Sequence, residues 1–74
     1  MPDHADAKLS DVQLALATLT EAFAIALERH NPGIAADVLT VLQEGIEQLE
    51  EMERDEARVM LLTAANRLAK VAGL

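Results

Sequence analysis

The tripeptide Asn31-Pro32-Gly33 is the sequence feature that most constrains the fold, because Pro32 is the only proline after Pro2. Proline lacks a backbone donor and disfavours helical geometry at the residue before it. A helix is therefore expected to end before Pro32, and a second helix to begin there. Asn31 is the expected N-cap of the second helix, with Pro32 at its first position.

Apolar residues on both sides of this breaker recur at steps of three and four, which is the spacing of one helix face. Residues 10–30 are expected to begin with a capping box formed by Ser10 and Gln13. Their expected inward face contains Val12, Leu16, Leu19, Phe23 and either Ala26 or Leu27. In residues 32–53 the expected inward residues are Ile34, Val38, Val41, Leu42, Leu49 and Met52. In residues 55–72 they are Ala57, Leu61, Ala64, Leu68 and Val71. Gly45 lies within the second apolar face and suggests close approach of another backbone.

The boundary between the second and third helices contains neither glycine nor proline, so its position depends on helical phase. On one straight helix, the apolar faces before and after residues 53–56 would point roughly 100° apart and miss a common core. Asp55 is a suitable cap for a new helix that folds back. The sequence thus predicts an all-α, three-helix antiparallel bundle in residues 10–74, after a flexible tail of residues 1–9. The alternative is a short helix plus one long helix in an intertwined dimer.

Stability is the main difficulty for a chain of 74 residues, because its single core barely offsets the entropy lost on folding. The chain has no cysteine and two histidines, so we expect no disulfide, metal or cofactor, and association is the remaining way to gain stability. Several aliphatic residues also fall away from the expected inward faces. These candidates for a self-association or partner surface are Leu14, Ile25, Leu39, Ile46, Val59 and Leu62. A homodimer is the expected assembly.

Negative charge is concentrated in residues 34–56, which contain eight acids and one base. Four of the acids, Asp37, Glu44, Glu47 and Glu51, follow helical spacing and form an acidic stripe. One interpretation is a binding surface for a basic protein, in which the stripe imitates a nucleic-acid backbone. The other is a solvated helix face that keeps the protein soluble.

Catalysis, nucleic-acid binding and membrane binding are all disfavoured by the residue types present. A solvent-facing row of carboxylates gives each acid a similar environment, whereas acid–base catalysis needs different ones. Arg58, Arg67 and Lys70 are scattered around their helix, and there is no tyrosine or tryptophan for stacking on bases. A membrane-surface helix would need a basic polar face. We therefore expect a cytoplasmic, non-enzymatic adaptor, chaperone or regulator that uses apolar helix faces, with an acidic inhibitor or nucleic-acid mimic as the alternative.

Overall fold

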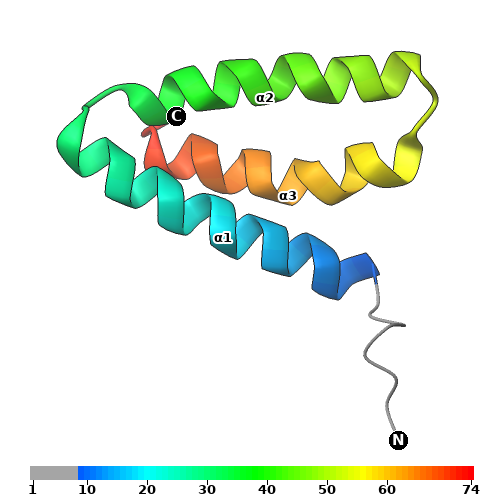
Figure 1. Ribbon diagram of the computed structural model, residues 1–74, viewed down its shortest axis with the longest axis horizontal. Coiled ribbons are helices and arrows are strands. Elements are labelled where there is room, and N and C mark those ends of the chain that lie inside the picture. Colours follow the sequence, from blue (N-terminus) through cyan, green and yellow to red (C-terminus); the bar gives the residue numbers. More distant parts are fainter. Residues whose placement is uncertain (1–8) are drawn as a thin grey trace, which may run out of the picture.

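The structure is a computed structural model that describes residues 9–74 as three helices (Figure 1). They are α1 (Leu9–His30), α2 (Ile34–Glu51) and α3 (Asp55–Val71). The prediction of an all-helical chain with three packed helices is confirmed. The expected flexible tail lies outside the described residues, except for Leu9, with which α1 begins.

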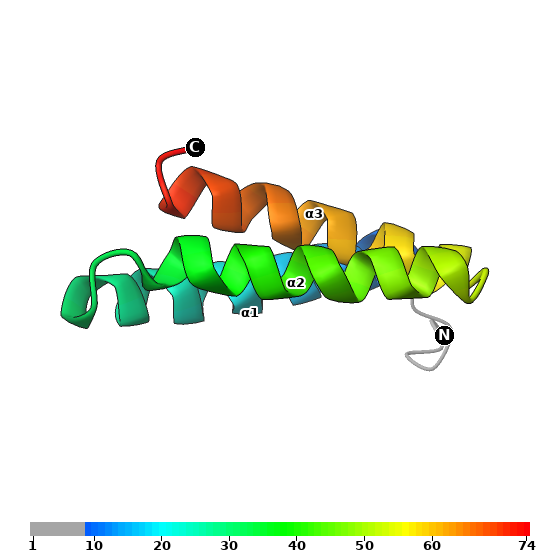
Figure 2. The same ribbon diagram turned by 90° about the horizontal axis from the view of Figure 1, so that it is seen from above.

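The three helices form a thin layer with α3 between α1 and α2. α1 and α2 diverge from the turn that joins them, and α3 returns through the space between them, antiparallel to α2 (Figure 1). Toward its C-terminal end α3 rises to one side of the other two helices (Figure 2). The molecule measures 43 × 32 × 15 Å, and its shortest dimension is little more than the roughly 10–12 Å diameter of one helix. Such a layer encloses less core than a closed bundle of three helices.

The core is small and consists mostly of alanine. Its central cluster is formed by Ala24, Ala35, Leu39 and Leu68, and Ala17 and Ala64 are also buried. Leu68 is the only large side chain that is fully buried among the described residues. Alanine side chains let helix backbones approach closely, but they remove little apolar surface from water. The fold therefore gains close helix contacts and only modest hydrophobic stabilisation.

The predicted inward face of α1 is wrong. Phe23 is 61% exposed and Leu19 is 56% exposed, whereas Ala17 and Ala24 are buried. Gln13, which we expected to cap its own helix, instead donates a hydrogen bond from Nε2 to the carbonyl oxygen of Val59 in α3, at 2.9 Å. The small and polar side of α1 faces α3 because these residues permit close contact and form direct polar bonds. The larger aliphatic residues are consequently turned away.

In α2, as in α1, the buried side of the helix is rotated away from the predicted inward side. Leu39, which the sequence placed on the contact surface, is only 6% exposed and belongs to the core. Val41, predicted to be inward, is 66% exposed. The buried position of Ala35 places Leu39, Leu42 and Ile46 toward α3, since these residues follow it at helical spacing. A Cβ atom at Gly45 would meet nothing within 4 Å, so within residues 9–74 no other backbone approaches Gly45 closely, contrary to the expectation.

The N-cap of α2 is Gly33 and not Asn31, and the side chain that holds the turn between α1 and α2 is that of Glu28. The carboxylate of Glu28 accepts hydrogen bonds from the backbone amides of Gly33 at 2.8 Å and Ala35 at 3.0 Å. Gly33 has a φ of 98°, a left-handed conformation that glycine adopts without strain. These two bonds satisfy amides at the start of α2 that have no partner within the helix. They also lower the pKa of Glu28, because they stabilise its charged form.

The turn between α2 and α3 settles the helix boundary that the sequence left open. The amide of Glu53 donates to the carbonyl of Glu50 at 3.0 Å, and the amide of Arg54 donates to that of Leu49 at 2.9 Å. This pair of bonds is a Schellman motif, which ends a helix through one left-handed residue. Glu53 has that conformation, with a φ of 59°. The long continuous helix is therefore excluded in this structure, although neither glycine nor proline marks the break.

Alanine packing in α1 makes a direct prediction about stability. Ala24→Leu should lower the free energy of unfolding by about 1–3 kcal/mol, because the added atoms would have to enter the contact with α2 and α3. Ala22→Leu is the matched control on the exposed side of the same helix and should change it by less than about 0.5 kcal/mol. Urea unfolding monitored by circular dichroism measures both. Equal effects would mean that Ala24 does not face the core.

The Glu28 cap predicts a pH-dependent stability. Because the pKa of folded Glu28 lies below its ordinary value of 4.5, this contribution should be complete above that pH and disappear as the pH falls through the folded pKa. Glu28→Gln should therefore lower the melting temperature near neutral pH, and the difference from the unchanged protein should shrink in acid. Glu47→Gln removes the same charge from the exposed side of α2 and controls for net charge. A Glu28→Gln deficit that stayed constant into acid would contradict the cap.

Candidate interaction surface

One side of the helical layer presents apolar residues from both α1 and α2. We call this set the apolar face, and it consists of Leu16, Leu19, Phe23, Leu27, Ile34, Val38, Val41 and Met52. Phe23 precedes the buried Ala24, just as Val38 precedes the buried Leu39. α1 and α2 run in opposite directions and contact α3 from opposite sides. Residues that are rotated by the same angle from the buried side of each helix therefore lie on the same side of the layer. The two helices therefore contribute to one surface.

The apolar face is unusual because it is both exposed and free of charge. Six of its eight members are exposed large hydrophobics, and Val41, Met52, Phe23 and Leu19 are each more than half exposed. Among residues 9–74 no acid or base lies within it, and Asp37 borders it on α2. Contiguous exposed apolar patches beyond a few hundred Å² are uncommon on soluble monomers and mark interaction sites. This segregation makes the apolar face the candidate interaction surface of the described residues.

A hollow on α2 lies within the apolar face. It is lined by Asp37, Val38, Val41 and Leu42. Val38 and Val41 give the hollow an exposed aliphatic floor, and its lining surface is entirely apolar, with Asp37 contributing carbon atoms rather than carboxylate oxygens. An apolar side chain would fit this hollow.

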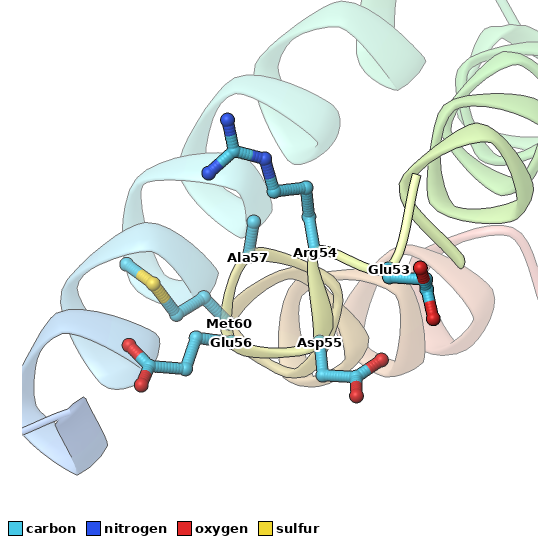
Figure 3. A pocket seen from close by; sticks show the side chains of 6 residues that line it. All are labelled: Glu53, Arg54, Asp55, Glu56, Ala57 and Met60. Carbon is cyan, nitrogen blue, oxygen red and sulfur yellow. The ribbon is translucent and has the colours of Figure 1, made fainter. Parts of the chain in front are cut away.

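A second hollow lies at the α2–α3 turn, where α1 and α2 are far apart (Figure 3). Its lining residues are Glu53, Arg54, Asp55, Glu56, Ala57 and Met60. Arg54 and Ala57 point into the space between α1 and α2, whereas Glu56 and Met60 point toward α1 (Figure 3). The three acids here are exposed to solvent.

The six residues that the sequence selected as a contact surface do not form one surface. Leu14 and Ile25 lie on the flank of α1 that carries Thr18, opposite to Phe23. Leu62 is exposed on α3, and Val59 is half-buried in the same helix. Ile46 is half-buried in α2, and Leu39 is unavailable to a partner because it is in the core.

The acidic stripe is solvent-exposed along its whole length. Asp37, Glu44, Glu47 and Glu51 are all exposed, and none forms an ion pair with any residue in the range 9–74. Arg67 instead pairs with Glu21 of α1, with 3.1 Å between Nη1 and Oε1, and lies 3.5 Å from the hydroxyl of Thr18. Arg67 therefore connects α3 to α1 and does not neutralise the acidic stripe.

Residues 9–74 contain no group of three or more histidine or acidic side chains placed to hold a metal ion. By length and composition alone, the segment Ser10–His30 is apolar enough to cross a membrane. The core helices of soluble proteins and signal sequences also have this composition, but only 11% of this segment is buried, and it contacts α3 through the Arg67–Glu21 pair.

Comparison of the chain with protein-family models, with characterised proteins and with solved structures finds no match.

Sequence reasoning missed the apolar face because it assigned the largest residues of α1 and α2 to the core. A signal was nevertheless present in α1. Gln13, Ala17, Glu21, Ala24 and Glu28 also follow helical spacing, and they combine small side chains with groups that form polar bonds. This second periodicity marks the side that packs closely.

Val41 and Leu42 are neighbours in α2 with different exposure to solvent, so the same substitution should have different effects on stability at the two positions. Val41→Glu should change the free energy of unfolding by less than about 0.5 kcal/mol, because the new carboxylate would lie in water. Leu42→Glu should cost about 3 kcal/mol or more, since Leu42 packs against the core cluster and a charge would be buried there. Urea unfolding of both variants is the measurement. If Val41→Glu were as unstable as Leu42→Glu, Val41 would not be exposed in the folded protein.

Proposed function

We propose that this protein is a non-enzymatic interaction module, an adaptor, chaperone or regulator that acts by contact through its apolar face. The observation that supports the proposal most directly is the separation of charge from exposed aliphatic surface. Eight apolar residues on two helices occupy one side of the layer without a charged residue among them. Interfaces bury such surfaces at their centre and place charges at the rim.

The chemistry of the partner follows from what borders the apolar face on α2. Asp37 lines the same hollow as Val38 and Val41, and Glu44 lies two helical turns further along the same side of the helix. A helix with an apolar side and basic residues along one edge would bury its apolar side against α2 and place its cations near these carboxylates. We therefore propose an amphipathic, basic-edged helix as the partner of α2. The proposed assembly of the protein itself is a homodimer.

An acidic inhibitor or nucleic-acid mimic is the second candidate function, and one observation favours it. The four carboxylates of the acidic stripe are exposed and have no cationic partner among residues 9–74. A basic protein surface would form ion pairs with them. In this alternative the stripe carries the binding energy, and the apolar face contributes little.

The two candidates differ in which substitution abolishes binding and in their response to salt. Val41→Glu should abolish capture of a cellular partner, whereas Thr40→Glu places the same charge one residue away on the exposed acidic side and should leave capture intact. Binding through the apolar face should also persist at high ionic strength. The measurement is affinity capture with each variant as bait, followed by titration of the identified partner. Normal binding by Val41→Glu together with steep loss in salt would reject the apolar face in favour of the acidic stripe.

A further inference from the structure

We propose that the α1 half of the apolar face is covered by α1 of a second copy, packed antiparallel about a two-fold axis. The contact residues are Leu16, Leu19, Phe23 and Leu27. This inference rests on the proposed function, because it assigns one occupant to part of the apolar face and leaves the α2 part for a different protein. The α1 half and the α2 half of the apolar face thus have different partners.

The small core is the first argument for a second copy. Six residues are buried in the described structure, and four of them are alanine. A chain of 74 residues gains little stability from such a core, and the sequence contains no cysteine for a disulfide. Burying the exposed side chains of Leu19, Phe23 and Leu27 in each of two copies would supply apolar burial that the single layer lacks. A second copy is present wherever the first one is, so this cover needs no other component.

Charge at the two ends of α1 selects the antiparallel arrangement. Asp11 lies in the first turn of α1, and Arg29 and His30 lie in its last turn. In an antiparallel pair, the acidic end of each helix lies beside the basic end of the other, and the two helix dipoles also oppose each other favourably. A parallel pair would place like charges together at both ends.

The remaining acids of α1 do not oppose this contact, because both are engaged within the chain. Glu21 pairs with Arg67 of α3. Glu28 accepts the amide hydrogens of Gly33 and Ala35. The flank that carries Leu19 and Phe23 is thus uncharged between its ends, apart from His30 when that residue is protonated.

Charge also excludes α2 as the self-contact. Between Ile34 and Glu51 the helix carries five acids and no lysine, arginine or histidine, so two copies of α2 packed through Val38 and Val41 would bring the bordering acids of both copies together with no cation between them. Like charges across an interface are costly and suppress the wrong partner. The α2 part of the apolar face therefore suits a basic-edged partner, and the α1 part suits a second copy.

The test is the molar mass of the whole protein, measured by light scattering during size exclusion and by analytical ultracentrifugation from micromolar to millimolar concentration. The unchanged protein should be a dimer. Leu19→Glu should raise the dimer dissociation constant by at least about thirtyfold, as expected for a substitution at the centre of an interface. Leu14→Glu is the matched control, because Leu14 is 51% exposed on the other flank of the same helix, and this variant should stay dimeric. Circular dichroism checks that both variants remain helical, and Val41→Glu should also stay dimeric.

The orientation of the two helices is tested with a spin label at Ser10→Cys, which would be the only cysteine of the chain. Antiparallel packing centred on Leu19 and Phe23 separates the two labels by roughly 30 Å or more, given the rise of 1.5 Å per residue. A parallel pair would bring them to about 10 Å, the usual distance between packed helix axes. Pulsed electron paramagnetic resonance measures this separation, and the shorter distance would overturn the proposed arrangement.

Three further outcomes would overturn the second copy as the occupant, and each differs from failure of the proposed function. A monomer at every concentration would leave the whole apolar face open to another protein. A dimer lost in Leu14→Glu and kept in Leu19→Glu would move the self-contact to the opposite flank of α1. Flotation of the unchanged protein with neutral phosphatidylcholine vesicles, abolished by Leu19→Glu, would assign this flank to a lipid surface. The proposed function itself fails only if a partner binds Val41→Glu normally.

Discussion

Close packing of alanine determines the rest of this structure. Ala17 and Ala24 are buried in α1, and Ala24 meets Ala35, Leu39 and Leu68 in the core cluster. Alanine at these positions lets the helices approach, and polar residues beside them connect α1 to α3 through Gln13 and Glu21. Once the small side of α1 is committed to this contact, its larger aliphatic residues must lie outside. The exposed apolar face is therefore a direct consequence of how the core is made.

The layered architecture adds a second consequence. Because α3 lies between α1 and α2, neither outer helix covers the other, and each retains an uncovered flank. The Glu28 cap holds the chain where α1 ends and α2 begins, and the Schellman turn reverses α2 into α3. These two connections fix the directions of the helices, and opposite directions in α1 and α2 place their exposed flanks on the same side. A surface for association thus arises from three short amphipathic helices without a deep pocket.

Electrostatics gives that surface its selectivity. The two halves of the apolar face have similar aliphatic chemistry but different surroundings, since α1 has opposite charges at its two ends and α2 carries only acids. Hydrophobic burial would favour covering either half, whereas charge discriminates between the molecules that cover each one. The acidic stripe in this account sets which partner α2 accepts, and it also keeps an otherwise aliphatic protein soluble.

The sequence by itself determined that the protein is all-helical and that a helix ends at Asn31-Pro32-Gly33, because proline and the spacing of apolar residues act locally. It also favoured the break near Asp55, where helical phase made a straight helix a poor solution. Only the tertiary structure decided which faces of α1 and α2 are buried, whereas the face predicted for α3, with Ala64 and Leu68, is the buried one. Helical spacing shows which residues share a side, as it did for Leu19 with Phe23 and for Val38 with Val41. It does not reveal whether large or small side chains will face the neighbouring helix, because that depends on how closely the backbones approach and on polar contacts between distant residues.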